Sequence, residues 1–373
     1  MTYNPLRDLA ELGQSIWYDN IHRTLLEGGE LERLVREDGL RGVTSNPTIF
    51  DKAISGGDSY DAAIVRLIQE QPDLSVEDIF LHLAVADIRD AADILRPVYE
   101  QTGGQDGMVS MEVSPLLAAD TEATIREARR LHARVDRPNL MIKVPATPEG
   151  LPAIETLISD GINVNVTLIF SVERYREVVR AYLAGLRERA ARRLPLDKVT
   201  SVASLFVSRI DSAVDPRLDG IHTDIRGRVA VANARTAYRH FLDVFDGNDF
   251  NSLRAAGAHE QRLLWASTGT KNPHYSDVLY VEELCGPRTV NTLPPATLDA
   301  FRDHGRTRVS LPGDSATDRQ VLSRLADAGI TLADVMDTLE AEGVKAFADS
   351  YGNLLAALET RLARIRAQRR TAI

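Results

Sequence analysis

The sequence has little of what disulfide-stabilised, secreted or membrane proteins require. Its 373 residues include one cysteine, Cys285, so no internal disulfide can form. No uninterrupted apolar run approaches the roughly 20 residues that span a bilayer. The start, MTYNPLRDLAEL, has no basic segment followed by a long apolar stretch. We therefore expect a cytoplasmic protein without a membrane partner.

Motifs for metals and nucleotides are also missing. The eight histidines show no H-E-x-x-H spacing and there is no cysteine pair, so we expect no bound metal. No G-x-G-x-x-G opens the chain, as an open dinucleotide-binding sheet would normally show. The closest stretch, TGGQDGMVS at 102–110, sits between a helix and a strand, where glycines more simply end the helix.

Acidic residues outnumber basic ones, 54 against 44, which gives a net charge of −10. This charge repels nucleic acid and anionic membranes, so an anionic substrate must meet a local positive pocket. The basic end RLARIRAQRR (361–370) fits a solvated helical face better than a nucleic-acid patch. Hydrophobic residues at 44% and charged residues at 26% are ordinary for a folded globular chain.

What the sequence does contain is an alternation of short β-rich segments with long amphipathic ones, up to about residue 294. The strand candidates are 14–19, 42–45, 108–114, 140–146, 162–170, 199–209, 262–268 and 289–293, and helical spacing covers 59–71, 75–101, 121–135 and 171–193. Strands that alternate with helices imply a parallel sheet, and eight of them favour a closed (β/α)8 TIM barrel. An open doubly wound sheet is the alternative.

The C-terminal part differs in composition from the rest. From residue 295 it becomes polar loop and helix, and the pattern over 317–370 predicts three helices. Because no linker or repeat marks a boundary, we expect one barrel domain over 1–373, with 295–373 as a helical extension packed on it.

Polar side chains recur where the predicted strands end, which is where barrel enzymes place their active sites. They are Asp19, Thr44, Ser45, Asn46, Glu112, Lys143, Asn163, Asn165 and Thr167. Period two puts Asn163, Asn165 and Thr167 on one face. Singly, each has an ordinary explanation: Asp19 could cap a helix starting at Asn20, Glu112 could pair with an arginine, and Asn165 could satisfy backbone groups. Together they favour a site, because every buried polar group needs a partner.

Lys143 lies inside the apolar run NLMIKVPA (139–146), although lysine is rarely fully buried. Desolvation and nearby positive charge lower the pKa of a buried lysine, so that its neutral amine can attack a carbonyl and form a Schiff base. The imine permits a carbon–carbon bond one position farther along to break, with Glu112 and Asp19 moving the protons. The alternatives are a salt bridge to one of these carboxylates, or a phosphate contact.

The motifs together resemble the transaldolase family. They are YDN (18–20), GVTSNPTIF (42–50), MEVSP (111–115), LMIKVPAT (140–147), INVNVTLIFS (162–171) and SLFVSRID (204–211). The later WASTGTKNPHYSDVLYVEELCGPRTVNTLP (265–294) resembles the long-chain bacterial form, and the similarity spans 15 to about 360. The resemblance implies a cofactor-independent transferase of the pentose phosphate pathway, moving a dihydroxyacetone unit between phosphorylated sugars.

The resemblance also implies roles for individual residues. Lys143 would form the Schiff base, Asp19 would accept the hydroxyl proton, and Glu112 would work with a water and Thr167 in imine formation. The residues implied to bind substrate are Asn46 and Asn165 at the donor hydroxyls, Ser204 and Arg209 on strand six, with Arg209 on the phosphate, and Phe206 beside them.

The chain departs from the better-known family pattern at the second phosphate ligand. Where those enzymes have a further arginine, it offers Ser267 and Lys271. The related fructose 6-phosphate aldolase, an alternative activity, usually has glutamine at Glu112 and tyrosine at Phe206, so both residues favour transaldolase. A noncatalytic sugar-phosphate binder is a further alternative, and the sequence leaves both monomer and homodimer open.

Overall fold

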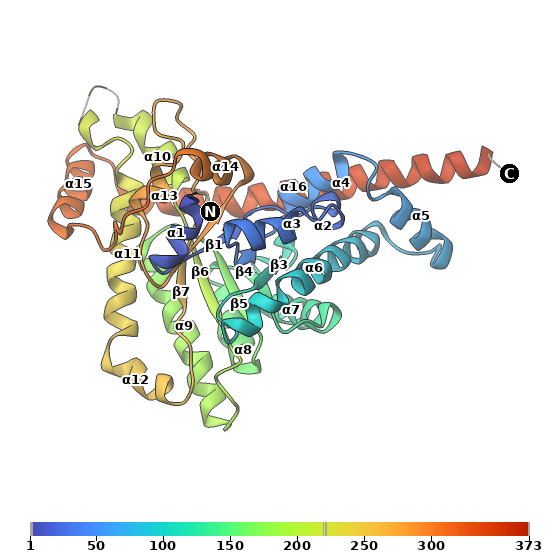
Figure 1. The fold of residues 1–373 in the computed structure, drawn as a ribbon, viewed down its shortest axis with the longest axis horizontal. Helices are drawn as coiled ribbons and strands as arrows, with labels where there is room; N and C mark the ends of the chain where they lie inside the picture. The colour runs from blue at the N-terminus through green and yellow to red at the C-terminus, as the bar shows by residue number, and fades with distance from the viewer. Residues whose placement is uncertain (1–2, 219, 221, 372–373) are drawn as a thin grey trace.

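Eight parallel strands close into a barrel, because each pairs with the next in the chain and β8 pairs with β1 (Figure 1). The computed structural model describes residues 3–218, 220 and 222–371. The strands are β1 (Gln14–Tyr18), β2 (Gly42–Val43), β3 (Met108–Glu112), β4 (Leu140–Pro145), β5 (Val164–Ile169), β6 (Ser201–Phe206), β7 (Arg262–Ala266) and β8 (Thr289–Leu293). Every predicted strand is present, so the predicted barrel is confirmed.

The strands are apolar along their length because helices cover the outside of the barrel while side chains fill its interior. Nearly every strand residue is buried. Strands β1 to β7 end earlier than the sequence pattern predicted, whereas β8 has the predicted bounds. The pattern extends strand six to residue 209, but β6 ends at Phe206 and a helix begins at Ser208.

Helices connect the strands, and the predicted segments 59–71, 75–101, 121–135 and 171–193 all contain one. The α-helices are α1 (Pro5–Glu11), α2 (Arg23–Glu27), α3 (Glu30–Arg33), α4 (Pro47–Ser55), α5 (Asp61–Glu70), α6 (Val76–Gln101), α7 (Thr121–Val135), α8 (Gly150–Asp160), α9 (Val172–Ala191), α10 (Ser208–Val214), α11 (Val229–Phe245), α12 (Asn248–Ala255), α13 (Leu279–Glu283), α14 (Pro295–His304), α15 (Ser315–Asp327) and α16 (Leu332–Thr371). Gly103 and Gly104, both with positive φ, follow the end of α6. The glycine cluster therefore ends a helix, as predicted.

The C-terminal segment forms fewer helices than predicted. Residues 317–370 fall in two helices, α15 and the 40-residue α16, so the prediction of three was wrong. One position shows why α16 continues through a glycine. A Cβ on Gly343 would lie 3.0 Å from Leu168 Cδ2, so this glycine lets α16 approach β5 closely. Tertiary packing, which local propensity does not register, keeps the helix intact.

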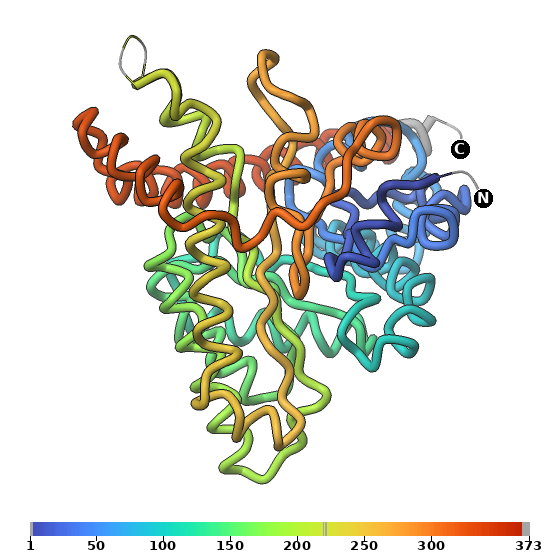
Figure 2. The backbone as a smooth tube through the Cα atoms, turned by 60° about the vertical axis from the view of Figure 1, so that its left-hand side comes forward, coloured from blue at the N-terminus to red at the C-terminus, as the bar shows by residue number. Residues whose placement is uncertain are grey.

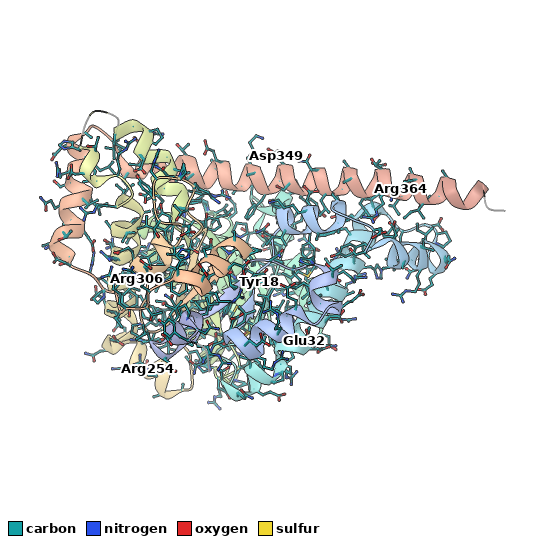
Figure 3. All side chains as sticks on the ribbon, turned by 45° about the horizontal axis from the view of Figure 1, so that its top comes forward. Tyr18, Glu32, Arg254, Arg306, Asp349 and Arg364 are labelled. Atoms are coloured by element: carbon teal, nitrogen blue, oxygen red, sulfur yellow. The ribbon has the colours of Figure 1, made fainter. Side chains whose placement is uncertain are left out.

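Helix α16 runs across the end of the barrel where the strands finish (Figures 1 and 2). It contacts α4 and α10, the helices that follow β2 and β6, and it also contacts β5. Asp349 and Arg364, labelled on this helix in Figure 3, are both exposed. No helix among the described residues is long and apolar enough to cross a membrane.

Candidate active site

A cavity of about 730 Å³ opens at the C-terminal ends of the strands; we call it the main cavity. The predicted site residues that line it are Asp19, Asn46, Lys143, Thr167, Ser204, Phe206, Arg209, Ser267 and Lys271. Glu112 and Asn165 flank Lys143, because β3, β4 and β5 place these three residues in register. The structure thus brings all eleven residues of the predicted site to one end of the barrel.

Lys143 projects from β4 into the main cavity. Its Nζ lies 3.4 Å from Glu112 Oε2 and donates a hydrogen bond of 3.0 Å to the carbonyl oxygen of Ser45. The Phe347 ring of α16 is 5.9 Å from Nζ, and the residue is only 5% exposed. The amine therefore faces a confined cavity beside a carboxyl group, an arrangement that suits a lysine nucleophile.

Glu112 is the last residue of β3, and its side chain is 4% exposed. Burial raises the pKa of this carboxyl, while the charge of Lys143 opposes the shift. Neither carboxylate oxygen hydrogen-bonds to another described residue. Its ion pair is with Lys143, not with an arginine. A carboxyl group in this setting can hold or release a proton next to the lysine.

Asp19 follows β1 and lines the main cavity from another side. It accepts a hydrogen bond of 2.7 Å from Thr44 Oγ1. Burial raises the pKa of Asp19, and Lys143, the Thr44 hydrogen bond and Lys271 oppose this. The residue caps no helix, because α2 begins at Arg23 and is capped by His22. Its carboxylate is available as a proton acceptor.

Strand β5 carries Asn165 next to Lys143 and Thr167 on the wall of the main cavity, and its backbone is irregular near Thr167. The β5–β6 register shifts between Val166 and Ile169, and Leu168 there has φ of +60°, a conformation that bulky residues rarely adopt. Asn165 Nδ2 donates to Ser110 Oγ (3.0 Å), and its Oδ1 accepts from Ser204 Oγ (2.7 Å). The side chain therefore serves other side chains, not the backbone.

The other two predicted asparagines, Asn163 and Asn46, form hydrogen bonds with backbone groups. Asn163, just before β5, donates to the carbonyl oxygens of Pro138 and Leu140. These hydrogen bonds hold the start of β5 against the start of β4. Asn46 Oδ1 accepts a hydrogen bond of 3.0 Å from the Ile49 N–H and so caps α4. Asn46 also lines the main cavity, so its position is fixed by the helix that it caps.

Positive groups gather on the β6–β7 side of the main cavity. The Arg209 guanidinium lies 5.3 Å from the centroid of the Phe206 ring, and burial lowers the pKa of Arg209. Lys271 and Ser267 line the same cavity. Ser267 has φ of +55°, and its hydroxyl lies 3.0 Å from that of Ser208. An anionic substrate group can be held here despite the negative net charge.

Some residues of the site were not predicted from the sequence. Phe347 reaches Lys143 from α16, and nothing near it in the sequence indicates this contact. Ser110 holds Asn165 through its hydroxyl; its position on a predicted inner strand was the available signal. Among residues 3–218, 220 and 222–371, no group of three or more His, Cys, Asp or Glu side chains is placed to hold a metal ion.

Comparisons with known proteins agree with this geometry. A family model described as Transaldolase/Fructose-6-phosphate aldolase matches residues 16–358. A transaldolase of Trichodesmium erythraeum (strain IMS101) is 47% identical over 379 residues, covering 98% of this chain and 99% of the relative. Transaldolases of Thermobifida fusca (strain YX) and Thiobacillus denitrificans (strain ATCC 25259 / T1) are each 49% identical, covering 96% and 95% of this chain and 99% of each relative.

Proposed function

This chain belongs to the transaldolase/fructose-6-phosphate aldolase family, and from that premise we propose how its residues act. It is an enzyme of the transferase class, with transaldolase activity. Its reaction moves a dihydroxyacetone unit from fructose 6-phosphate or sedoheptulose 7-phosphate to glyceraldehyde 3-phosphate or erythrose 4-phosphate. The observation that carries the proposed mechanism is the buried Lys143 amine, 3.4 Å from Glu112 in the main cavity.

The first step joins the donor to Lys143. Glu112 first takes a proton from the Lys143 ammonium; the neutral Nζ then attacks the C2 carbonyl carbon, and a carbinolamine forms as an N–H proton moves to the oxygen. Glu112 gives a proton to the carbinolamine oxygen, the C–O bond breaks, and water leaves as the C=N bond forms. The raised pKa of Glu112 supports this role, because the carboxyl keeps a transferable proton at higher pH than an exposed glutamate would. Thr167, whose buried hydroxyl has no hydrogen-bond partner among the described residues, can position the departing oxygen.

The second step breaks the C3–C4 bond. Asp19 takes the proton of the C4 hydroxyl, the aldose phosphate leaves, and the bond electrons pass into the imine to give an enamine on Lys143. Addition of this enamine to an acceptor aldehyde reverses the step. Asn46 and Asn165 bind the donor hydroxyls. Because the enamine persists until an acceptor aldehyde binds, the dihydroxyacetone unit is transferred to that aldehyde and is not released.

The phosphate group lies on the β6–β7 side of the cavity. Arg209 can donate two parallel hydrogen bonds to it, and stacking on Phe206 fixes the plane of the guanidinium. Lys271 adds a point charge, and Ser204 and Ser267 add hydroxyl donors. We place the reaction in the cytoplasm and in the non-oxidative pentose phosphate pathway; the chain acts there as a monomer or a homodimer.

An acceptor-dependence assay tests the proposal. With fructose 6-phosphate and erythrose 4-phosphate together, sedoheptulose 7-phosphate and glyceraldehyde 3-phosphate should form. With fructose 6-phosphate alone, release of free dihydroxyacetone should be at least roughly 100-fold slower, since the enamine waits for an acceptor. Equal rates of release and transfer would indicate an aldolase, and binding with no exchange of carbon units would indicate a sugar-phosphate binder.

A further inference from the structure

A second, smaller cavity lies beside Glu112, and we call it the side cavity. It measures about 40 Å³, whereas one water needs roughly 10–15 Å³. Its polar lining includes Glu112, Ser114, Glu77, Glu127, Arg130 and Tyr351. Lys143 lines the main cavity and Glu112 lines the side cavity, so the ion pair of these two residues stands between the two spaces.

The side cavity leads from the interior to the surface. At its inner end the Glu112 side chain is 4% exposed, and Tyr351 is 5% exposed. At its outer end Glu77 and Arg130 are exposed. The carboxyl of Glu112 therefore has a route toward solvent, lined by both polar and apolar side chains, that does not pass through the main cavity.

Tyr351 and Glu77 form the ordered part of this route. Tyr351 Oη donates a hydrogen bond of 2.9 Å to Glu77 Oε1. The tyrosine ring is held edge-on to Phe80, with centroids 5.8 Å apart, so its hydroxyl has a fixed place. Both oxygens of Glu112 lack a hydrogen bond to any described residue. Buried carboxyl oxygens require partners, and water in a polar cavity is a common one.

The Schiff-base reaction moves water and protons at Lys143. Forming the imine releases one water, and hydrolysing it consumes one. In hydrolysis, water adds to the imine carbon and one of its protons passes to the Glu112 carboxylate; the hydroxyl proton of the carbinolamine then moves to Nζ as the C–N bond breaks, and the ketose leaves. During both steps the sugar occupies the main cavity, and Phe347 covers Lys143 from α16. The side cavity reaches Glu112 without passing through the space that the sugar occupies.

We propose that the side cavity carries the water that the imine releases and consumes, and returns the proton of Glu112 to solvent. Tyr351 and Glu77 are positioning residues for that water. This inference rests on the proposed function, since it assigns a task only if Lys143 forms an imine. It also gives α16 a part in the reaction, because α16 supplies Tyr351.

Exchange of the C2 oxygen of fructose 6-phosphate with water tests the inference directly. Each cycle of imine formation and hydrolysis replaces this oxygen. The rate at which ¹⁸O is lost from C2, measured without an acceptor, therefore reports how fast water leaves and reaches the imine. Tyr351→Phe keeps the ring against Phe80 and removes only the hydroxyl. We expect enzyme-catalysed ¹⁸O loss to slow roughly ten-fold, with KM for fructose 6-phosphate unchanged within about two-fold. Ser114→Leu, which fills the cavity, should slow it as well.

Tyr275→Phe is the matched control, because it removes a 2.7 Å tyrosine–carboxylate hydrogen bond, to Asp215, away from both cavities. It should exchange ¹⁸O as the wild type does. If Tyr351 only stabilised the fold, Tyr351→Phe would instead have a higher KM and a lower melting temperature than the wild type. Wild-type exchange rates in both Tyr351→Phe and Ser114→Leu would overturn the inference alone. No exchange in a wild-type enzyme that still transfers carbon units would also overturn the inference alone, and a wild-type enzyme that shows neither exchange nor transfer would overturn the proposed function.

Discussion

At the scale of single residues, the charge state of Asp19 decides whether the carbon–carbon bond can break. The residue must be a carboxylate to accept a proton, yet burial raises its pKa above the usual 3.8. Lys143, the Thr44 hydrogen bond and Lys271 act in the opposite direction. Activity should therefore depend on these neighbours, most visibly on the acid side of the pH profile.

We expect Thr44→Val to shift the acid limb of kcat/KM to higher pH. The substitution removes a hydrogen bond that stabilises the charged form, so the pKa of Asp19 rises. Below its pKa Asp19 is protonated and cannot accept a proton, so activity is lost as the pH falls through that value. Profiles of kcat/KM report the free enzyme. Thr338→Val, at an exposed position of α16, is the control and should leave the acid limb of kcat/KM unchanged. If Thr44→Val and the wild type had the same acid limb, Asp19 would not be the group that titrates there.

At the scale of elements, α16 is fastened to the segment that follows β2. Arg361 is 9% exposed, and its Nε donates a hydrogen bond of 2.5 Å to Asp61. Its other nitrogens donate to the carbonyl oxygens of Ile54 and Gly57. Gly57 lines the main cavity, so this anchor connects the helix to the wall of the site.

Removing the anchor should destabilise the protein. For Arg361→Ala we expect the free energy of unfolding to fall by about 2 kcal/mol, because the carbonyl oxygens and Asp61 lose their partner. Arg364→Ala is the matched control on the same helix. That arginine is 60% exposed and lies 3.6 Å from Asp61, so its loss should cost about 0.5 kcal/mol or less. Guanidinium denaturation measures both; equal effects would show that Arg361 is no anchor.

At the scale of the whole molecule, the sequence predicted what depends on local pattern. Apolar strands that alternate with amphipathic helices indicated the barrel, and polar residues at strand ends such as Lys143 indicated the site. The contacts made by α16 were not predicted. Phe347 and Tyr351 reach the site from α16, which is far along the chain from the strands. The need for glycine at position 343 arises from the close approach of α16 to Leu168. Contacts between distant segments leave no periodic signal in one sequence.

The most direct test of the central claim is borohydride reduction in the presence of fructose 6-phosphate, followed by mapping of the modified residue by mass spectrometry. The mechanism predicts a stable three- or six-carbon adduct on Lys143 and none on Lys52 or Lys271, which line the same cavity. Lys143→Ala should take up no label and lose activity roughly 10³-fold or more with its circular dichroism unchanged. An adduct on another lysine, or full turnover by Lys143→Ala, would contradict the account.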